Sequence, residues 1–118
     1  MLMDLCRLLS GAPLTMDDVR RELAGLPVEA AVQPVPGTDT PAFVRLYLTE
    51  PSQLTLDTLR ETFGPYKKTP RLHRNAPDHY IIYVDLAGYP YRCALIAAKK
   101  LDQPAVQTVT VRRDIRLG

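Results

Sequence analysis

The sequence predicts an α+β fold in which helices pack on one antiparallel sheet. The stretch LTMDDVRRELAG at residues 14–25 recurs as LTLDTLRETFG at residues 54–64, and each copy carries the start and stop signals of an amphipathic helix. Alternating apolar strand patterns follow each copy at hairpin-length spacing. We therefore expect two helix-then-strand units, αββ and αβββ, with a short extra helix at the N-terminus.

The first expected helix covers residues 1–10. Leu2, Leu5, Leu8 and Leu9 are spaced to share one face of a helix. Residues 11–13, Gly-Ala-Pro, end this pattern.

The first copy of the repeated motif starts at Thr15, a residue type that caps helix N-termini by accepting a first-turn amide hydrogen. Asp17 and Asp18 favour the positive end of the helix dipole. Gly25 and Pro27 then end the helix.

The second copy follows the same plan. Thr55 is the expected cap, and Asp57 lies in the first turn. Leu59 and Phe63 lie on the apolar side, and Gly64 ends the helix. The chain is thus predicted as one domain, residues 1–118, with an internal repeat at 12–50 and 52–118; chance similarity of the two motifs is the alternative.

Five strands are expected: VEAAVQPV (28–35), AFVRLYLT (42–49), HYIIYVDL (79–86), YRCALIAAK (91–99) and VQTVTVRRDI (106–115). In the second of these, Val44 and Leu46 alternate with Arg45 and Tyr47, which is typical of a strand with two different faces. Short connections such as PGTDTP and AGYP favour antiparallel pairing.

The two motif copies, read as LTxxxVxxxLG, and the strands after them resemble the repeat of the beta-lactamase inhibitory protein and SmpA/OmlA families. That resemblance implies a protein-binding scaffold without an active site, and it carries over no functional residue. The sequence departs from those families because it has no export signal, no paired cysteine and no tryptophan in its strands.

Composition sets the broad class. The 118 residues are 46% hydrophobic, which is typical of a globular chain. The two cysteines, Cys6 and Cys93, lie in apolar runs and are expected to be buried, reduced thiols. With neither an export signal nor a long apolar run, we expect a cytoplasmic protein that does not enter a membrane.

The charge is unevenly distributed. Residues 1–50 hold four arginines and seven carboxylates, a net −3, whereas residues 51–118 hold eleven lysines and arginines and six carboxylates, a net +5. The basic residues are densest at residues 67–74, which we call the basic connector. Its candidate partner-binding residues, with the flanking tyrosines, are Tyr66, Lys67, Lys68, Arg71, His73, Arg74 and Tyr80.

The basic connector has three interpretations. It is a solvated loop, a surface that binds an acidic protein, or a site that binds nucleic acid. The last interpretation follows because cations can contact the phosphate backbone while aromatic rings between them stack on bases. Arg112, Arg113 and Arg116 extend the site if the strand order brings them near.

No motif points to catalysis, a cofactor or a metal. His73, His79 and Asp78 do not make a zinc site by themselves, because neither cysteine is close to them in the sequence. A Cys93–His79 dyad also requires an exposed, activated thiolate, whereas Cys93 lies in an apolar run.

These observations favour a small module that binds another protein, with a nucleic-acid-associated protein as the alternative and an enzyme as a third class that we do not predict. An acidic protein is one candidate for the partner, the oligomeric state is open, and a homodimer is one alternative for it. If the basic connector is only a loop, the next candidate surface is the strand face with Phe43, Arg45 and Tyr47.

Overall fold

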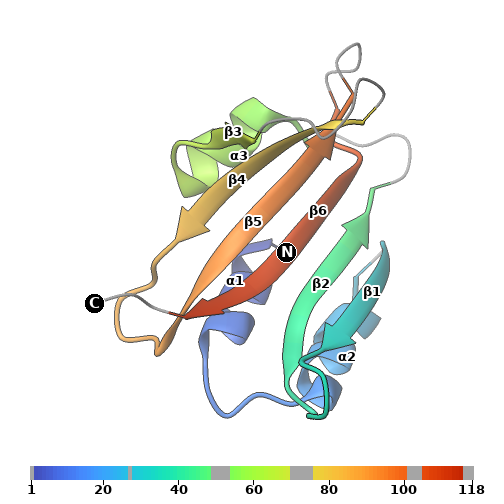
Figure 1. The fold of residues 1–118 in the computed structure, drawn as a ribbon, viewed down its shortest axis with the longest axis vertical. Coiled ribbons are helices and arrows are strands. Elements are labelled where there is room, and N and C mark those ends of the chain that lie inside the picture. The colour runs from blue at the N-terminus through green and yellow to red at the C-terminus, as the bar shows by residue number, and fades with distance from the viewer. Residues whose placement is uncertain (1, 27, 49–53, 70–75, 101–104, 116–118) are drawn as a thin grey trace.

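A computed structural model describes residues 2–26, 28–48, 54–69, 76–100 and 105–115. Within these residues, three helices pack against one antiparallel sheet of six strands, which confirms the α+β class (Figure 1). The helices are α1 (Leu2–Ser10), α2 (Met16–Ala24) and α3 (Leu56–Phe63). The strands are β1 (Glu29–Pro34), β2 (Pro41–Tyr47), β3 (Lys67–Thr69), β4 (Asp78–Val84), β5 (Tyr91–Lys99) and β6 (Thr108–Ile115).

Both motif helices begin at the predicted N-caps. Thr15 Oγ1 accepts a hydrogen bond from the Asp18 amide at 3.3 Å, and the Thr15 amide donates to Asp18 Oδ2 at 3.0 Å, which completes a capping box. Thr55 Oγ1 accepts from the Thr58 amide at 3.2 Å. α3 ends at Gly64, whose φ of 112° strains any residue with a Cβ.

The strand order is β1-β2-β6-β5-β4-β3, and every neighbouring pair is antiparallel. The β2–β6 pair joins the first half of the chain to the second, with Val44 opposite Val111. β3 was not expected from the sequence. It lies in the stretch assigned to the connector, where Lys68 pairs with Tyr80, and three residues are too few for a period-two pattern to show.

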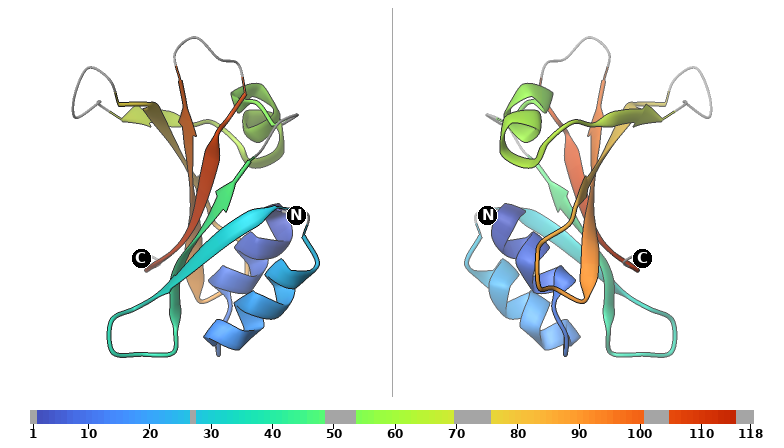
Figure 2. Two further views of the ribbon diagram at one scale, coloured as in Figure 1. Left: turned by 90° about the vertical axis from the view of Figure 1, so that its right-hand side faces the viewer. Right: turned by 90° about the vertical axis from the view of Figure 1, so that its left-hand side faces the viewer.

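One face of the sheet carries the hydrophobic core, and Figure 2 shows all three helices on that side. α1 packs on β5 and β6, α2 on β1, and α3 on β4. We call this the covered face. Its strand residues include Val44, Leu46, Ile82, Leu95, Val109 and Val111, which meet Leu5 and Leu9 of α1, Val19 of α2 and Leu59 of α3 in one cluster.

The opposite side of the sheet is the open face. No helix of the described residues covers it, and the strands lie in front of the helices when it faces the viewer (Figure 1). Because strand side chains alternate between the two sides, every second residue of each strand belongs to this face. The open face therefore presents a large set of side chains that the core does not use.

Candidate functional site

The open face displays a continuous row of side chains across five strands. The registers align Arg45 with Thr110, Thr110 with Ile96, and Ile96 with Ile81. Lys67 follows Ile81 at the β3 edge. A cation thus lies at each end of a row whose middle is apolar or weakly polar.

Side-chain size varies across the open face. Ala98 on β5 and Thr110 on β6 are small, whereas the flanking strands β2 and β4 carry Tyr47 and Tyr83. Tyr47 is 38% exposed and Tyr83 43% exposed, so both aromatic rings reach solvent. Small side chains thus lie between two strands that carry exposed aromatic rings.

Two hollows lie on this face, and Arg45 and Tyr47 line both. The first has a volume of about 350 Å³ and extends over Ile96, Ala98 and Thr110. The second, of about 440 Å³, lies on the β1 side of the same two residues. Arg45 and Tyr47 thus form a ridge from which a partner can be contacted on either side.

The cations of the open face differ in how they are held. Arg112 donates to Asp114 through Nε at 2.8 Å and Nη2 at 3.0 Å, and this contact raises the pKa of Arg112 further. Arg92 donates to Asp85 at 3.0 Å. Both charges are therefore neutralised within the chain.

Arg45 has no carboxylate within salt-bridge distance among the described residues. Its Nε donates to Thr110 Oγ1 at 3.3 Å, and its guanidinium lies 5.7 Å from the centre of the Phe43 ring. These contacts fix the direction of the side chain without neutralising its charge. Arg45 is thus oriented on the ridge and retains donors for an acidic group.

The structure separates the residues of the basic connector that it describes. Lys67 is exposed on the open-face side of β3, opposite Ile81. Lys68 lies on the other side, opposite Tyr80, and its Nζ is 3.5 Å from Asp78 Oδ2. Arg71, His73 and Arg74 lie outside the described residues.

The two candidate tyrosines pack against each other. Their ring centres are 5.1 Å apart in an edge-to-face arrangement. Tyr80 is 9% exposed, and Tyr66 is partly buried against the core cluster. Both rings are therefore engaged in packing beside β3.

The two described C-terminal arginines, Arg112 and Arg113, lie on opposite sides of the sheet. Arg113 lies on the covered-face side, where it donates to the Gly11 carbonyl at 3.0 Å and stacks over the Tyr91 ring at 3.6 Å. Arg112 is paired with Asp114 on the open face. Arg116 lies outside the described residues.

The two cysteines are free and fully buried, as expected. Cys93 Sγ donates to Cys6 Sγ at 3.0 Å, and this contact together with burial raises the pKa of Cys93 far above its ordinary value. His79 belongs to the open face and Cys93 to the covered face, so the two do not form a dyad. Both thiols are thus positioned for packing.

Within the part of the chain that the structure describes, no cluster of three or more His, Cys, Asp or Glu residues is arranged to hold a metal ion. None of the described helices combines the length and apolar character needed to cross a membrane.

Sequence reasoning named Phe43, Arg45 and Tyr47 from their alternation, but it missed the hollows. Those depend on Ile96, Ala98 and Thr110, which come from strands of the second half of the chain. The available signal was the small residue Ala98 in the apolar run of β5, since it lines the first hollow beside bulkier neighbours.

Comparison with known proteins adds no identity. No protein-family model matches the chain, and no curated protein or solved structure is significantly similar to it.

Proposed function

We propose that this protein acts by binding another protein through the open face of its sheet, with an acidic group of that partner held by Arg45. The observation that carries the proposal is the oriented, uncompensated Arg45 on a ridge between two hollows. Tyr47, Phe43 and Ile96 lie in the same two hollows or beside them. Aromatic residues and arginine are enriched at the centres of protein interfaces.

Charge supports an acidic protein rather than a nucleic acid. A nucleic-acid surface gains affinity by neutralising several phosphates with cations that are free to do so. Among the described residues of the open face, Arg92 and Arg112 are already paired with carboxylates, which leaves Arg45 on β2 and Lys67 on the β3 edge strand. One such cation beside apolar side chains suits a single carboxylate within an otherwise apolar contact.

The basic connector remains part of the proposal as a flank of the same surface. Lys67 ends the row that begins at Arg45, so a partner lying across the sheet reaches the connector at the β3 edge. The resemblance of the two helix motifs to protein-binding repeat families supports the same function and an internal repeat of two helix-then-strand units. The free thiols Cys6 and Cys93 support a reducing, cytoplasmic setting.

A capture experiment with matched charge reversals tests the function. Immobilised wild-type protein, Arg45→Glu and Arg60→Glu are each exposed to native cell extract, with and without nuclease. Arg60 is the control because it is an exposed arginine on α3, on the side of the sheet opposite the open face. It pairs with Asp57 at 3.0 Å. We expect a nuclease-resistant partner that binds the wild type and Arg60→Glu but not Arg45→Glu.

Other outcomes reject specific parts of the proposal. A partner lost after nuclease treatment supports nucleic-acid binding, as does wild-type binding to single-stranded RNA with a log–log salt slope of about −0.7 per phosphate neutralised. In a further variant, Lys67, Lys68, Arg71 and Arg74 are all replaced by serine. If this variant loses the partner while Arg45→Glu retains it, the binding surface is the basic connector and not the open face. Capture of only the protein itself identifies a homodimer.

A further inference from the structure

A second surface lies at the edge of the sheet, along β1. β1 is the last strand of the sheet order and pairs only with β2 among the described residues. An edge strand directs alternate backbone N–H and C=O groups away from the sheet, where another strand can pair with them. The register shift between Gln33 and Pro34 limits the regular part of this edge to residues 29–33.

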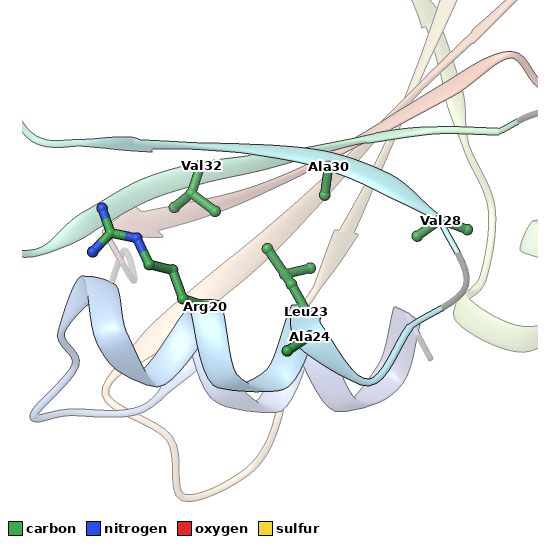
Figure 3. A pocket seen from close by; sticks show the side chains of 6 residues that line it. All are labelled: Arg20, Leu23, Ala24, Val28, Ala30 and Val32. Carbon is green, nitrogen blue, oxygen red and sulfur yellow. The ribbon is translucent and has the colours of Figure 1, made fainter.

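An apolar groove runs beside this edge, between β1 and α2 (Figure 3). Its volume is about 400 Å³, and its walls are Leu23, Ala24, Val28, Ala30 and Val32. Leu23 of α2 points toward β1 in the middle of the groove, and the small side chains of Ala24 and Ala30 leave space beside it (Figure 3). The groove therefore offers room for apolar side chains next to unpaired backbone groups.

A cation marks one end of the groove. Arg20 extends from α2 toward β1 at the Val32 end (Figure 3). Its side chain is 64% exposed, and its carboxylate partner is Asp17 at 3.3 Å, three residues earlier on the same helix. Such exposed pairs contribute little, so Arg20 can bind an incoming carboxylate at small cost.

We propose that the β1 edge and the α2–β1 groove accept an extended segment of another protein by strand addition. The added strand pairs its backbone with β1, alternate apolar side chains enter the groove, and an acidic residue meets Arg20. The cation at the Val32 end of the groove favours a segment that carries an acidic residue there. The inference is independent of the open face, since Ala30 and Val32 lie on the covered-face side of β1.

The probe is a fluorescein-labelled hexapeptide in which valine alternates with threonine and an aspartate ends the chain, and binding is followed by fluorescence anisotropy. Two further peptides carry N-methyl groups on alternate residues, one set on each edge of the extended chain. Strand addition predicts that one N-methylated peptide loses affinity by about tenfold or more, while the other binds as the parent does.

Side-chain substitutions place the peptide on the protein. Ala24→Gln fills the groove from an exposed helical position, and Ala87→Gln, in the exposed turn after β4, is its matched control. We expect about tenfold weaker binding for Ala24→Gln, unchanged binding for Ala87→Gln and Arg45→Glu, and equal thermal midpoints for all variants. Arg20→Glu should reverse the preference, so that a peptide ending in lysine binds more tightly than one ending in aspartate.

Three results overturn the inference. These are absence of saturable binding up to about 1 mM peptide, equal effects of the two N-methylated peptides, and full binding by Ala24→Gln. If sedimentation shows that the wild type is a dimer and that Ala24→Gln is a monomer, the occupant of the groove is a second copy of the chain and the proposed partner segment is rejected. Because these peptide measurements do not involve the open face, their failure leaves the proposed function untouched.

Discussion

Leu46 and Tyr47 are neighbours on β2, yet they belong to different environments. Leu46 is fully buried on the covered face, whereas Tyr47 is 38% exposed on the open face. Val109 and Thr110 on β6, and Leu95 and Ile96 on β5, likewise lie on opposite faces of the sheet. The same strands thus carry two surfaces that differ in packing, in charge and in their expected role.

The difference teaches where stability and binding reside. On the covered face, helices remove aliphatic side chains from water, which is the main favourable contribution to folding. On the open face, the side chains form aromatic–arginine contacts, such as Arg92 over Tyr83 at 4.4 Å, and leave hollows beside Arg45. Substitutions on the first face should therefore unfold the protein, and those on the second should alter recognition.

The largest expected effect comes from the paired variants Leu46→Ala and Tyr47→Ala. Leu46→Ala opens a cavity in the core and should lower the free energy of unfolding by about 2–5 kcal/mol. Tyr47→Ala should cost less than about 1 kcal/mol because the ring already reaches solvent. Urea denaturation measures both. Equal losses would contradict the division between the faces.

The cysteines sharpen the comparison through accessibility. Cys6 and Cys93 are buried between α1 and the covered face, and the contact with Cys6 raises the pKa of Cys93, so little reactive thiolate is present at neutral pH. We expect a thiol reagent to label both about 100-fold or more slowly than an unfolded control, since labelling requires opening of the core. Tyr83→Cys should add one rapidly labelled thiol on the open face. Rapid labelling of Cys93 in the wild type would instead show that α1 leaves the covered face readily.

The helix caps test how α2 and α3 are held on the covered face. Thr15→Ala and Thr55→Ala should each lower the free energy of unfolding by about 1 kcal/mol, the usual loss of an N-cap. Chemical denaturation measures both. No change in either cap variant would mean that the caps do not hold the helices.

The capping box of α2 adds a pH dependence that α3 lacks. The hydrogen bond from the Thr15 amide lowers the pKa of Asp18 below its ordinary value of 3.8. A lowered folded-state pKa stabilises the protein above the unfolded value, and this contribution is lost as the pH falls through the folded value. Asp18→Asn should therefore destabilise the protein at pH 7, and its difference from the wild type should shrink below about pH 4. A difference that stays constant down to pH 2 would mean that the charge has no part in the cap.

Local signals in the sequence were enough for most of the fold. Thr15 and Thr55 located two helix starts, and the alternation around Val44 and Leu46 separated the two faces of β2. The strand order was not accessible, because the pairing of Val44 with Val111 joins distant parts of the chain and depends on which long-range contacts bury the most apolar surface. β3 escaped notice because its three residues include two lysines.

The candidate site was accessible only in part for the same reason. Arg45 and Tyr47 could be placed on one face from their spacing, but the contact of Arg45 with Thr110 depends on the pairing of β2 with β6. Sequence reasoning favoured the basic connector because residues 67–74 hold four lysines and arginines. In the structure, Lys67 and Lys68 lie on opposite sides of β3, so these two neighbouring cations do not share one surface.

The central claim is that a partner covers the open face, and hydroxyl-radical footprinting of the captured complex tests it most directly. Side-chain oxidation of Phe43, Tyr47 and Tyr83 is quantified by mass spectrometry in the free and bound protein, with Phe63 of α3 as the reference on the helix side. We predict that binding protects Tyr47 and Phe43 most strongly and leaves Phe63 unchanged. Protection of Phe63 with unchanged oxidation of Tyr47 would contradict the account and place the binding surface on the helices.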